Sequence, residues 1–184
     1  TYGSAVILPA GQIQSLAWQI PSLPGASPWS PESPTLYRLI ISLHRNGQVV
    51  DETATTFGFR TFTAGMATIN GNTVPKFLLN GQPYFLKGYG VVSHLPVVND
   101  QAFIRSYLQK VKDSGANALR FCCSVPSPYW LAETDKIGLL ALVDLGTDGV
   151  LLVGNTGLPK VYSDTAYLAE TKIEYTTIIR SISS

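Results

Sequence analysis

Up to about residue 64, the alternation of apolar and polar residues predicts strands and no helix. Residues 36–43 form a strongly apolar extended run, and residues 49–60 return along it. Between them stands Asn46-Gly47, a dipeptide that supplies the positive φ angles of a tight hairpin. Shorter apolar runs predict two more strands, near residues 5–8 and 15–20. A complete immunoglobulin-like sandwich needs about seven strands, so we expect a partial β-sandwich over residues 1–64.

Prolines crowd the segment that precedes the hairpin. They stand at positions 21, 24, 28, 31 and 34, around Trp29. Because proline lacks an N–H donor and fixes φ, neither a helix nor a central strand accepts this spacing. We therefore expect a connection that lies across a sheet edge, with the Trp29 ring packed in the core.

After residue 65 the pattern changes to alternating strands and helices. A second hairpin is predicted over residues 77–86, around another Asn-Gly turn. A helix follows, with Asn99 or Asp100 as its cap and Gly115 at its end. The helical spacing of five residues predicts its buried stripe: Phe103, Ile104, Tyr107, Leu108 and Val111.

The remaining residues continue this alternation. A strand is predicted at residues 117–122, a helix at 128–137 and another strand at 139–143. A last helix is predicted at residues 164–182. Pro128 occupies the first helical position, and Gly138 closes that helix. Strands that alternate with helices pair in parallel through crossover connections. We therefore expect residues 65–184 to form the first three βα units of a (β/α)₈ barrel.

The composition describes a well-buried chain that is short of charge. Charged residues make up 14% of the chain, against about 25% in a typical soluble domain. Hydrophobic residues make up 45%, the net charge is +1 and the mean hydropathy is +0.16. These values argue against a disordered tail and against a nucleic-acid binder, and no apolar run is long enough to span a membrane. The scarcity of charge suggests that part of the surface is covered.

The cysteines and histidines give no sign of a metal or cofactor site. Cys122 and Cys123 are adjacent, and neighbours do not reach disulfide geometry without strain. A metal site would need ligands besides these thiols, and the only histidines are His44 and His94. We expect two small buried thiols, no metal and no cofactor. No signal peptide is recognised at Thr1, and the sequence indicates no compartment.

Five motifs, in order, resemble glycoside hydrolase family 2, the family of β-galactosidases, β-glucuronidases and β-mannosidases. They are WSPESPTLY at 29–37, FGFR at 57–60, LNGQP with LKG at 79–88, GANALR at 115–120 and DKIGL at 135–139. The likeness covers about residues 25–145. It implies sandwich modules followed by a TIM barrel, and retaining hydrolysis of β-glycosides.

The resemblance does not supply the catalytic residues. Retaining glycosidases need two carboxyl groups about 5–5.5 Å apart. In this family both are glutamates, at the ends of barrel strands 4 and 7, and the first follows an asparagine. None of the glutamates here follows an asparagine: Glu32, Glu52, Glu133, Glu170 and Glu174. We expect the last three on solvated helix faces, no catalytic residue, and no hydrolysis by this chain alone.

The resemblance does point to three candidate sugar-contacting residues at strand ends. His94 follows the first predicted barrel strand, Arg120 lies in the second, and Asp144 ends the third. Arg120 and Asp144 either orient sugar hydroxyls and carboxylates or form a buried pair that braces the strand ends. His94 either contacts a sugar or is an ordinary loop residue. The family's usual histidine after the second strand is missing from residues 120–126.

These observations leave two interpretations. The first is a fragment or truncated relative of a retaining β-glycoside hydrolase, inactive alone because its glutamates lie elsewhere. The alternative is a degenerate, non-enzymatic module for structural assembly or carbohydrate binding. The expected partners are a carbohydrate, and the remainder of the hydrolase chain or another protein that covers the open barrel edge.

Overall fold

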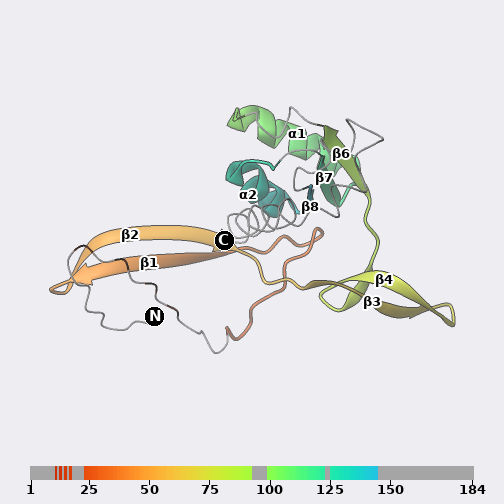
Figure 1. Ribbon diagram of the computed structural model, residues 1–184, viewed down its shortest axis with the longest axis horizontal. Coiled ribbons are helices and arrows are strands. Elements are labelled where there is room, and N and C mark those ends of the chain that lie inside the picture. The colour runs from red at the N-terminus through yellow and green to blue at the C-terminus, as the bar shows by residue number, and fades with distance from the viewer. Residues whose placement is uncertain are drawn as a thin grey trace, which may run out of the picture.

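The computed structural model describes residues 23–92, 99–122 and 125–144, together with the single residues 11, 13, 15 and 17. Within this part the chain forms eight strands and two helices. The strands make one two-stranded sheet and two three-stranded sheets. Two long hairpins project in opposite directions from a unit of strands and helices (Figure 1). The described part of the chain is therefore mostly β, with few helices.

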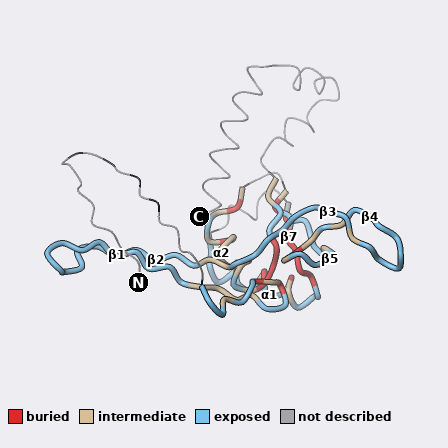
Figure 2. Tube along the Cα trace, turned by 90° about the horizontal axis from the view of Figure 1, so that it is seen from below, coloured by how far each residue is buried: buried red, intermediate tan, exposed pale blue. Residues whose placement is uncertain are grey.

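The first hairpin forms as predicted. Strands β1 (Tyr37–Arg45) and β2 (Gln48–Phe57) pair antiparallel, and Asn46 and Gly47 take φ angles of 53° and 76° at the turn. Its large apolar side chains stay exposed, among them Leu39, Ile40, Ile41, Leu43, Val49 and Val50. Figure 2 shows the hairpin as an almost wholly exposed ribbon. The strands predicted near 5–8 and 15–20 lie largely outside the described residues.

The second sheet is a three-stranded antiparallel meander. It consists of β3 (Phe62–Ile69), β4 (Asn72–Leu79) and β5 (Gln82–Tyr84). The turn at Asn80-Gly81 is the predicted one, and β3 is an addition that sequence analysis missed. Its signal was the second Asn-Gly pair, Asn70-Gly71, where φ is 51° and 79°. The small residues of β3 hid the strand, and β3 crosses the predicted boundary between residues 64 and 65.

The third sheet combines with the helices into an α/β unit. Its order along the chain is β6 (Gly88–Val92), α1 (Gln101–Asp113), β7 (Ala118–Cys122), α2 (Pro128–Ile137) and β8 (Leu140–Val143). The three strands are parallel and adjacent, in the order β6-β7-β8. The predicted alternation of strands and helices is therefore confirmed to this point, and the helix predicted at 164–182 lies outside the described residues.

Local signals set the ends of both helices. The Asp100 carboxylate accepts hydrogen bonds from the main-chain N–H groups of Ala102 and Phe103, at 2.9 and 3.0 Å. Helix α2 begins at Pro128, and Gly138 closes it with a φ of 80°. The stripe of α1 is buried at Ile104, Leu108 and Val111. Phe103, however, is 40% exposed, because it lies one position off that stripe.

Two apolar clusters form the core. The larger fills the space between the helices and one face of β6–β8, and it includes Phe121 and the fully buried Trp130. The smaller joins Trp29 to Ala118 and Leu140, near the amino ends of β7 and β8. Trp29 is fully buried, as predicted. The proline-rich segment thus covers the amino ends of the strands instead of lying across a sheet edge, because burial of the Trp29 ring draws it there.

Candidate functional site

Arg120 and Asp144 meet at the carboxyl ends of two neighbouring strands. Arg120 lies in β7, and Asp144 directly follows β8, which runs parallel to β7. The Arg120 side chain donates from Nε to Oδ1 of Asp144 at 3.1 Å and from Nη2 to Oδ2 at 2.5 Å. This two-point contact fixes the orientation of both side chains.

The ion pair forms as one of the sequence interpretations expects, but it is not buried. The Arg120 side chain is 53% exposed and that of Asp144 is 19% exposed. An exposed pair of this kind contributes about 0–1 kcal/mol to stability. The Arg120 side chain is therefore half exposed to solvent, while its partner carboxylate is mostly covered.

The sheet register places Arg120 on the face opposite the helices. Arg120 is level with Gly90 on β6 and with Leu142 on β8. Its neighbours Leu119 and Phe121 point the other way and are fully buried in the larger core cluster. A Cβ atom added at Gly90 would meet no atom of the described residues within 4 Å.

The third candidate residue is not placed with this pair. His94 lies within residues 93–98, outside the described residues, and so do positions 123 and 124. The structure therefore brings together two of the three predicted site residues, Arg120 and Asp144. Of the two thiols predicted to be buried, Cys122 lies in β7 and is half-buried, and Cys123 lies outside the described residues.

Each described glutamate contacts a neighbour away from these strand ends. Glu32 accepts a hydrogen bond from the Tyr84 hydroxyl at 2.6 Å, and Glu52 accepts one from Ser42 at 2.9 Å. Glu133 forms an ion pair with Lys136 at 2.7 Å. The prediction of a solvated Glu133 is wrong: it is 9% exposed, and its carboxylate accepts a hydrogen bond from Lys136 on the same helix. Glu170 and Glu174 lie outside the described residues.

Sequence reasoning missed a polar cluster under the amino ends of the strands. Burial would raise the pKa of Glu32, but hydrogen bonds from Tyr84, Ser30 and its own main chain hold it below its ordinary value. Burial and the bond to Glu32 raise the pKa of Tyr84. Burial also lowers the pKa of Lys112, whose Nζ donates to the main-chain oxygens of Pro31 and Gly138 at 2.6 and 2.7 Å. The WSPE motif signalled Glu32, but no sequence pattern named its partners.

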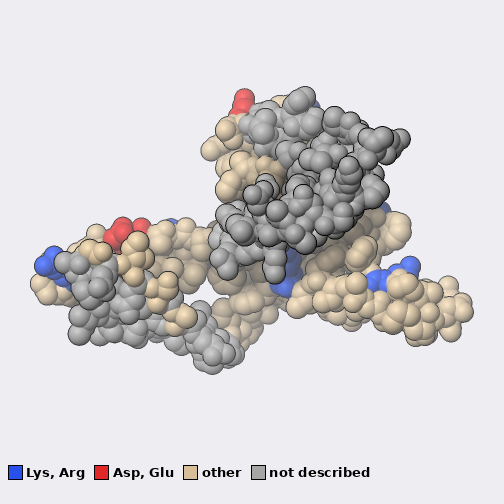
Figure 3. Space-filling model, viewed as in Figure 1, with Lys and Arg blue, Asp and Glu red and all other residues tan. Residues whose placement is uncertain are grey.

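Charge is sparse over the described surface. Figure 3 shows, among the described residues on this face, separate basic and acidic patches with uncharged residues between them. Across residues 23–92, 99–122 and 125–144, no three His, Cys, Asp or Glu side chains are grouped as a metal site. In the same part of the chain, neither helix is long and apolar enough to cross a membrane.

Comparison with known proteins shows what these elements are similar to. The family described as Glycosyl hydrolases family 2 matches residues 7–60. A Formosa agariphila protein named "Putative beta-glucuronidase" is 37% identical over 122 residues, which is 64% of this chain and 11% of that protein. The resemblance to glycosyl hydrolase family 2 is therefore confirmed. It is a partial one, since the chain spans about a ninth of this family 2 relative.

Solved structures of family 2 relatives agree with this assignment. Beta-glucuronidase 3 of Bacteroides uniformis superposes with a TM-score of 0.52 and 29% identity, over 64% of this chain and 14% of that one. The family 2 beta-galacturonidase of Eisenbergiella tayi, solved with galacturonate, gives a TM-score of 0.52 and 26% identity. That match covers 66% of this chain and 20% of the galacturonidase. The chain therefore corresponds to a section of each of these much longer relatives.

Proposed function

We propose that this chain is part of a retaining β-glycoside hydrolase and contributes to substrate binding rather than to bond cleavage. The observation that carries the proposal is the two-point contact between Arg120 and Asp144 at adjacent carboxyl strand ends. Enzymes with a (β/α)₈ barrel build their sites at these ends. On this proposal the α/β unit is the start of a barrel within residues 65–184, and β1–β2 belongs to a partial immunoglobulin-like sandwich within residues 1–64.

The substrate class we propose is a β-linked uronic acid. Two of the relatives are named for glucuronidase or galacturonidase activity, and one was solved with galacturonate. Guanidinium groups recognise carboxylates through two parallel hydrogen bonds. A sugar carboxylate would compete with Asp144 for Arg120, while sugar hydroxyls would donate to the Asp144 carboxylate. His94 would be a third contact from the segment after β6.

The two catalytic glutamates would come from outside this chain. A retaining mechanism requires two carboxyl groups about 5–5.5 Å apart, one as nucleophile and one as acid and base. The placement of the described glutamates supports the proposal, because Glu32 precedes β1, Glu52 lies in β2 and Glu133 in α2, and each contacts another residue. Without the two catalytic carboxyl groups, the chain alone would bind sugar and would not hydrolyse it.

The binding proposal is tested by following ¹⁵N-labelled chain by NMR during titration. Methyl β-D-glucuronide should shift signals of β7, β8 and the Arg120 Nε–H group more than methyl β-D-glucoside does. Asp144→Asn should keep this preference, whereas Arg120→Met should abolish it. Equal responses to both sugars, or a uronide response that survives Arg120→Met, would sink the assignment of the uronate contact.

The absence of catalysis is tested separately with a fluorogenic β-glucuronide. The purified chain should release no fluorophore above the uncatalysed rate. Turnover that disappears in Glu133→Gln or Glu32→Gln, with the fold intact by circular dichroism, would contradict the proposal. We expect the chain to bind methyl β-D-glucuronide in the NMR titration and to show no turnover of the fluorogenic substrate.

The exposed apolar hairpin favours a second candidate, a non-enzymatic module for assembly. Leu39, Ile41, Leu43 and Val49 on β1–β2 present the kind of surface that another protein covers. This candidate predicts association with a protein partner that is independent of sugar, and an unchanged NMR spectrum on adding either glycoside. The uronide titration therefore separates the two functions.

A further inference from the structure

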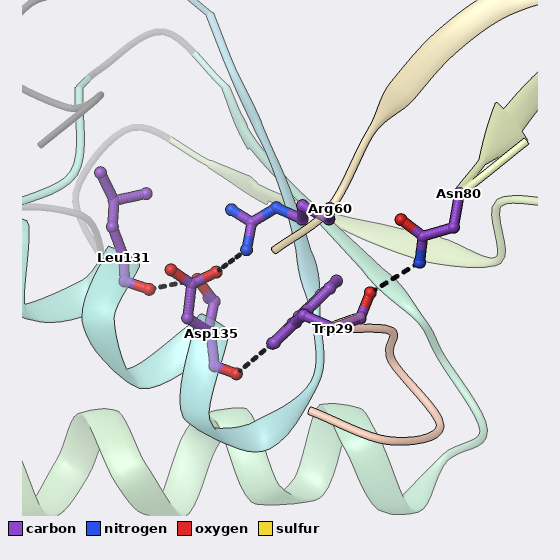
Figure 4. Close-up of polar contacts among 6 residues, drawn as sticks. Trp29, Arg60, Asn80, Leu131 and Asp135 are labelled. Carbon is purple, nitrogen blue, oxygen red and sulfur yellow. Dashed lines mark hydrogen bonds and ion pairs between the residues drawn. The ribbon is translucent and has the colours of Figure 1, made fainter. Parts of the chain in front are cut away.

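A small group of side chains holds the first hairpin to the α/β unit. We call Trp29, Arg60, Asn80 and Asp135 the joint cluster; they come from four separate stretches of the chain (Figure 4). The buried Trp29 indole donates from Nε1 to the main-chain oxygen of Asp135 at 2.8 Å. Asn80 Nδ2 donates to the main-chain oxygen of Trp29 at 3.0 Å. The Trp29 segment is thus fastened to α2 on one side and to the β4–β5 turn on the other.

Arg60 connects the ring and the carboxylate of this cluster. Its guanidinium carbon lies 4.6 Å from the centre of the Trp29 ring, and its Nη1 lies 2.9 Å from Oδ1 of Asp135. Both charged side chains are about one third exposed. A cation over an aromatic face and a charge-assisted hydrogen bond are both directional. Arg60 is therefore held in one orientation relative to α2.

Contacts at the base of the hairpin connect it to Arg60 through the preceding residue, Phe59. Tyr37, Phe57 and Phe59 form an aromatic group, with ring centres 5.2–6.1 Å apart. The Trp29 main-chain N–H donates to the Phe59 oxygen at 2.7 Å. Because Phe59 packs on both strands of the hairpin and precedes Arg60, movement of the hairpin base must displace Arg60 as well.

Close approach leaves little slack around the joint cluster. A Cβ atom added at Gly58 would lie 2.9 Å from Cβ of Trp29, and one added at Gly138 would lie 2.4 Å from the main-chain oxygen of Pro31. Lys112 donates to both the Pro31 and the Gly138 oxygens, which ties the proline-rich segment to the ends of both helices. Packing as tight as this favours one arrangement over a continuum of others.

We propose that the joint cluster is a latch that fixes the β1–β2 hairpin in one orientation relative to the α/β unit. The buried Trp29 ring provides the anchor, and the Arg60–Asp135 contact sets the angle. Loss of that contact frees the hairpin to swing while both parts remain folded. The latch thereby determines where the apolar faces of the hairpin point with respect to the strand ends that hold Arg120 and Asp144.

The test measures distances between spin labels on the hairpin and on α1. Non-natural amino acids at Gln48 and Lys110, both exposed, carry the labels, so the native cysteines are left unmodified. Pulsed electron resonance on the full chain should give one narrow distance distribution. Asp135→Asn and Arg60→Gln should each replace it with a broad one. The matched control is Glu133→Gln, which removes another paired carboxylate from α2 without touching the joint cluster.

Circular dichroism and thermal unfolding of the same samples show whether the variants are folded. If Arg60→Gln does not fold, Trp29→Phe provides the second variant, since it keeps a ring but removes the indole N–H donated to Asp135. Broad distributions confined to the joint variants support the latch. A narrow distribution in folded Asp135→Asn, or equal broadening in Glu133→Gln, would overturn it.

Discussion

The folded chain places the Asp135 carboxylate where its ionised form is less stable than in water. Burial raises its pKa above the ordinary value, although the neighbouring Arg60 lowers it. Partial desolvation thus disfavours the ionised form of Asp135 more than the contact with Arg60 favours it. A carboxyl group whose folded pKa is raised contributes stability that is complete below its unfolded pKa and is lost as pH rises through its folded pKa.

Removing Arg60 should therefore matter more at neutral than at acid pH. In Arg60→Met the ionised Asp135 loses its cation, so we expect destabilisation by about 1 kcal/mol at pH 7. The loss should be smaller at pH 4, because lowering the pH protonates more of Asp135, whose pKa is raised above the ordinary value. Urea unfolding at the two pH values measures the difference. Arg105→Met is the control, since Arg105 donates to the Tyr129 hydroxyl rather than to a carboxylate. An equal loss at both pH values would contradict this account.

For single residues, the sequence predicts some local contacts correctly but does not predict how far a side chain is buried. Asp100 was predictable, because a helix cap bonds main-chain groups two and three residues away. The burial of Glu133 was not predictable, since it depends on how α2 packs in the folded chain. Arg120 and Asp144 were predictable as neighbours from the parallel strands, but not their exposure.

At the scale of elements, the two helices start by different means. Asp100 caps α1 with two side-chain hydrogen bonds. Ser127 stands in the same position before α2, yet its side chain makes no cap hydrogen bond and its Oγ is buried without a partner. Pro128 compensates in α2, because it fixes the φ of the first turn in advance.

This difference predicts opposite results for two alanine substitutions. Asp100→Ala should lower the free energy of unfolding by about 1 kcal/mol, because two N–H groups of α1 lose their acceptor. Ser127→Ala should be neutral or slightly stabilising, since it removes a buried hydroxyl that has no partner. Thermal or urea unfolding of both variants checks the pair. A larger loss for Ser127→Ala than for Asp100→Ala would contradict the assignment of the caps.

At the scale of the whole molecule, the scarcity of charge meets an exposed apolar hairpin. Leu43 and Val49 on β1–β2 are more than half exposed. Strands with unpaired edges and apolar faces tend to pair with other chains. The exposed apolar side chains of β1–β2 are therefore one place where the surface lacks charge.

We expect the chain to self-associate through this hairpin as concentration rises. Leu43→Lys with Val49→Lys should reduce the association measured by light scattering, without lowering the unfolding temperature, because both positions are exposed in the folded chain. Leu108→Lys is the contrasting control: it should unfold the chain, because that side chain is fully buried. Unchanged association in the double variant would show that another surface is responsible.

The sequence by itself determined the local features of this protein. Asn-Gly turns, helix caps, the order of strands and helices and the family motifs all depend on interactions between residues close in the chain. Tertiary structure alone decided which distant groups meet. Trp29 reaches Asp135 across 106 positions, and Lys112 reaches Pro31 across 81. Such contacts follow from burying a ring and satisfying main-chain oxygens in three dimensions, which no spacing along the chain records.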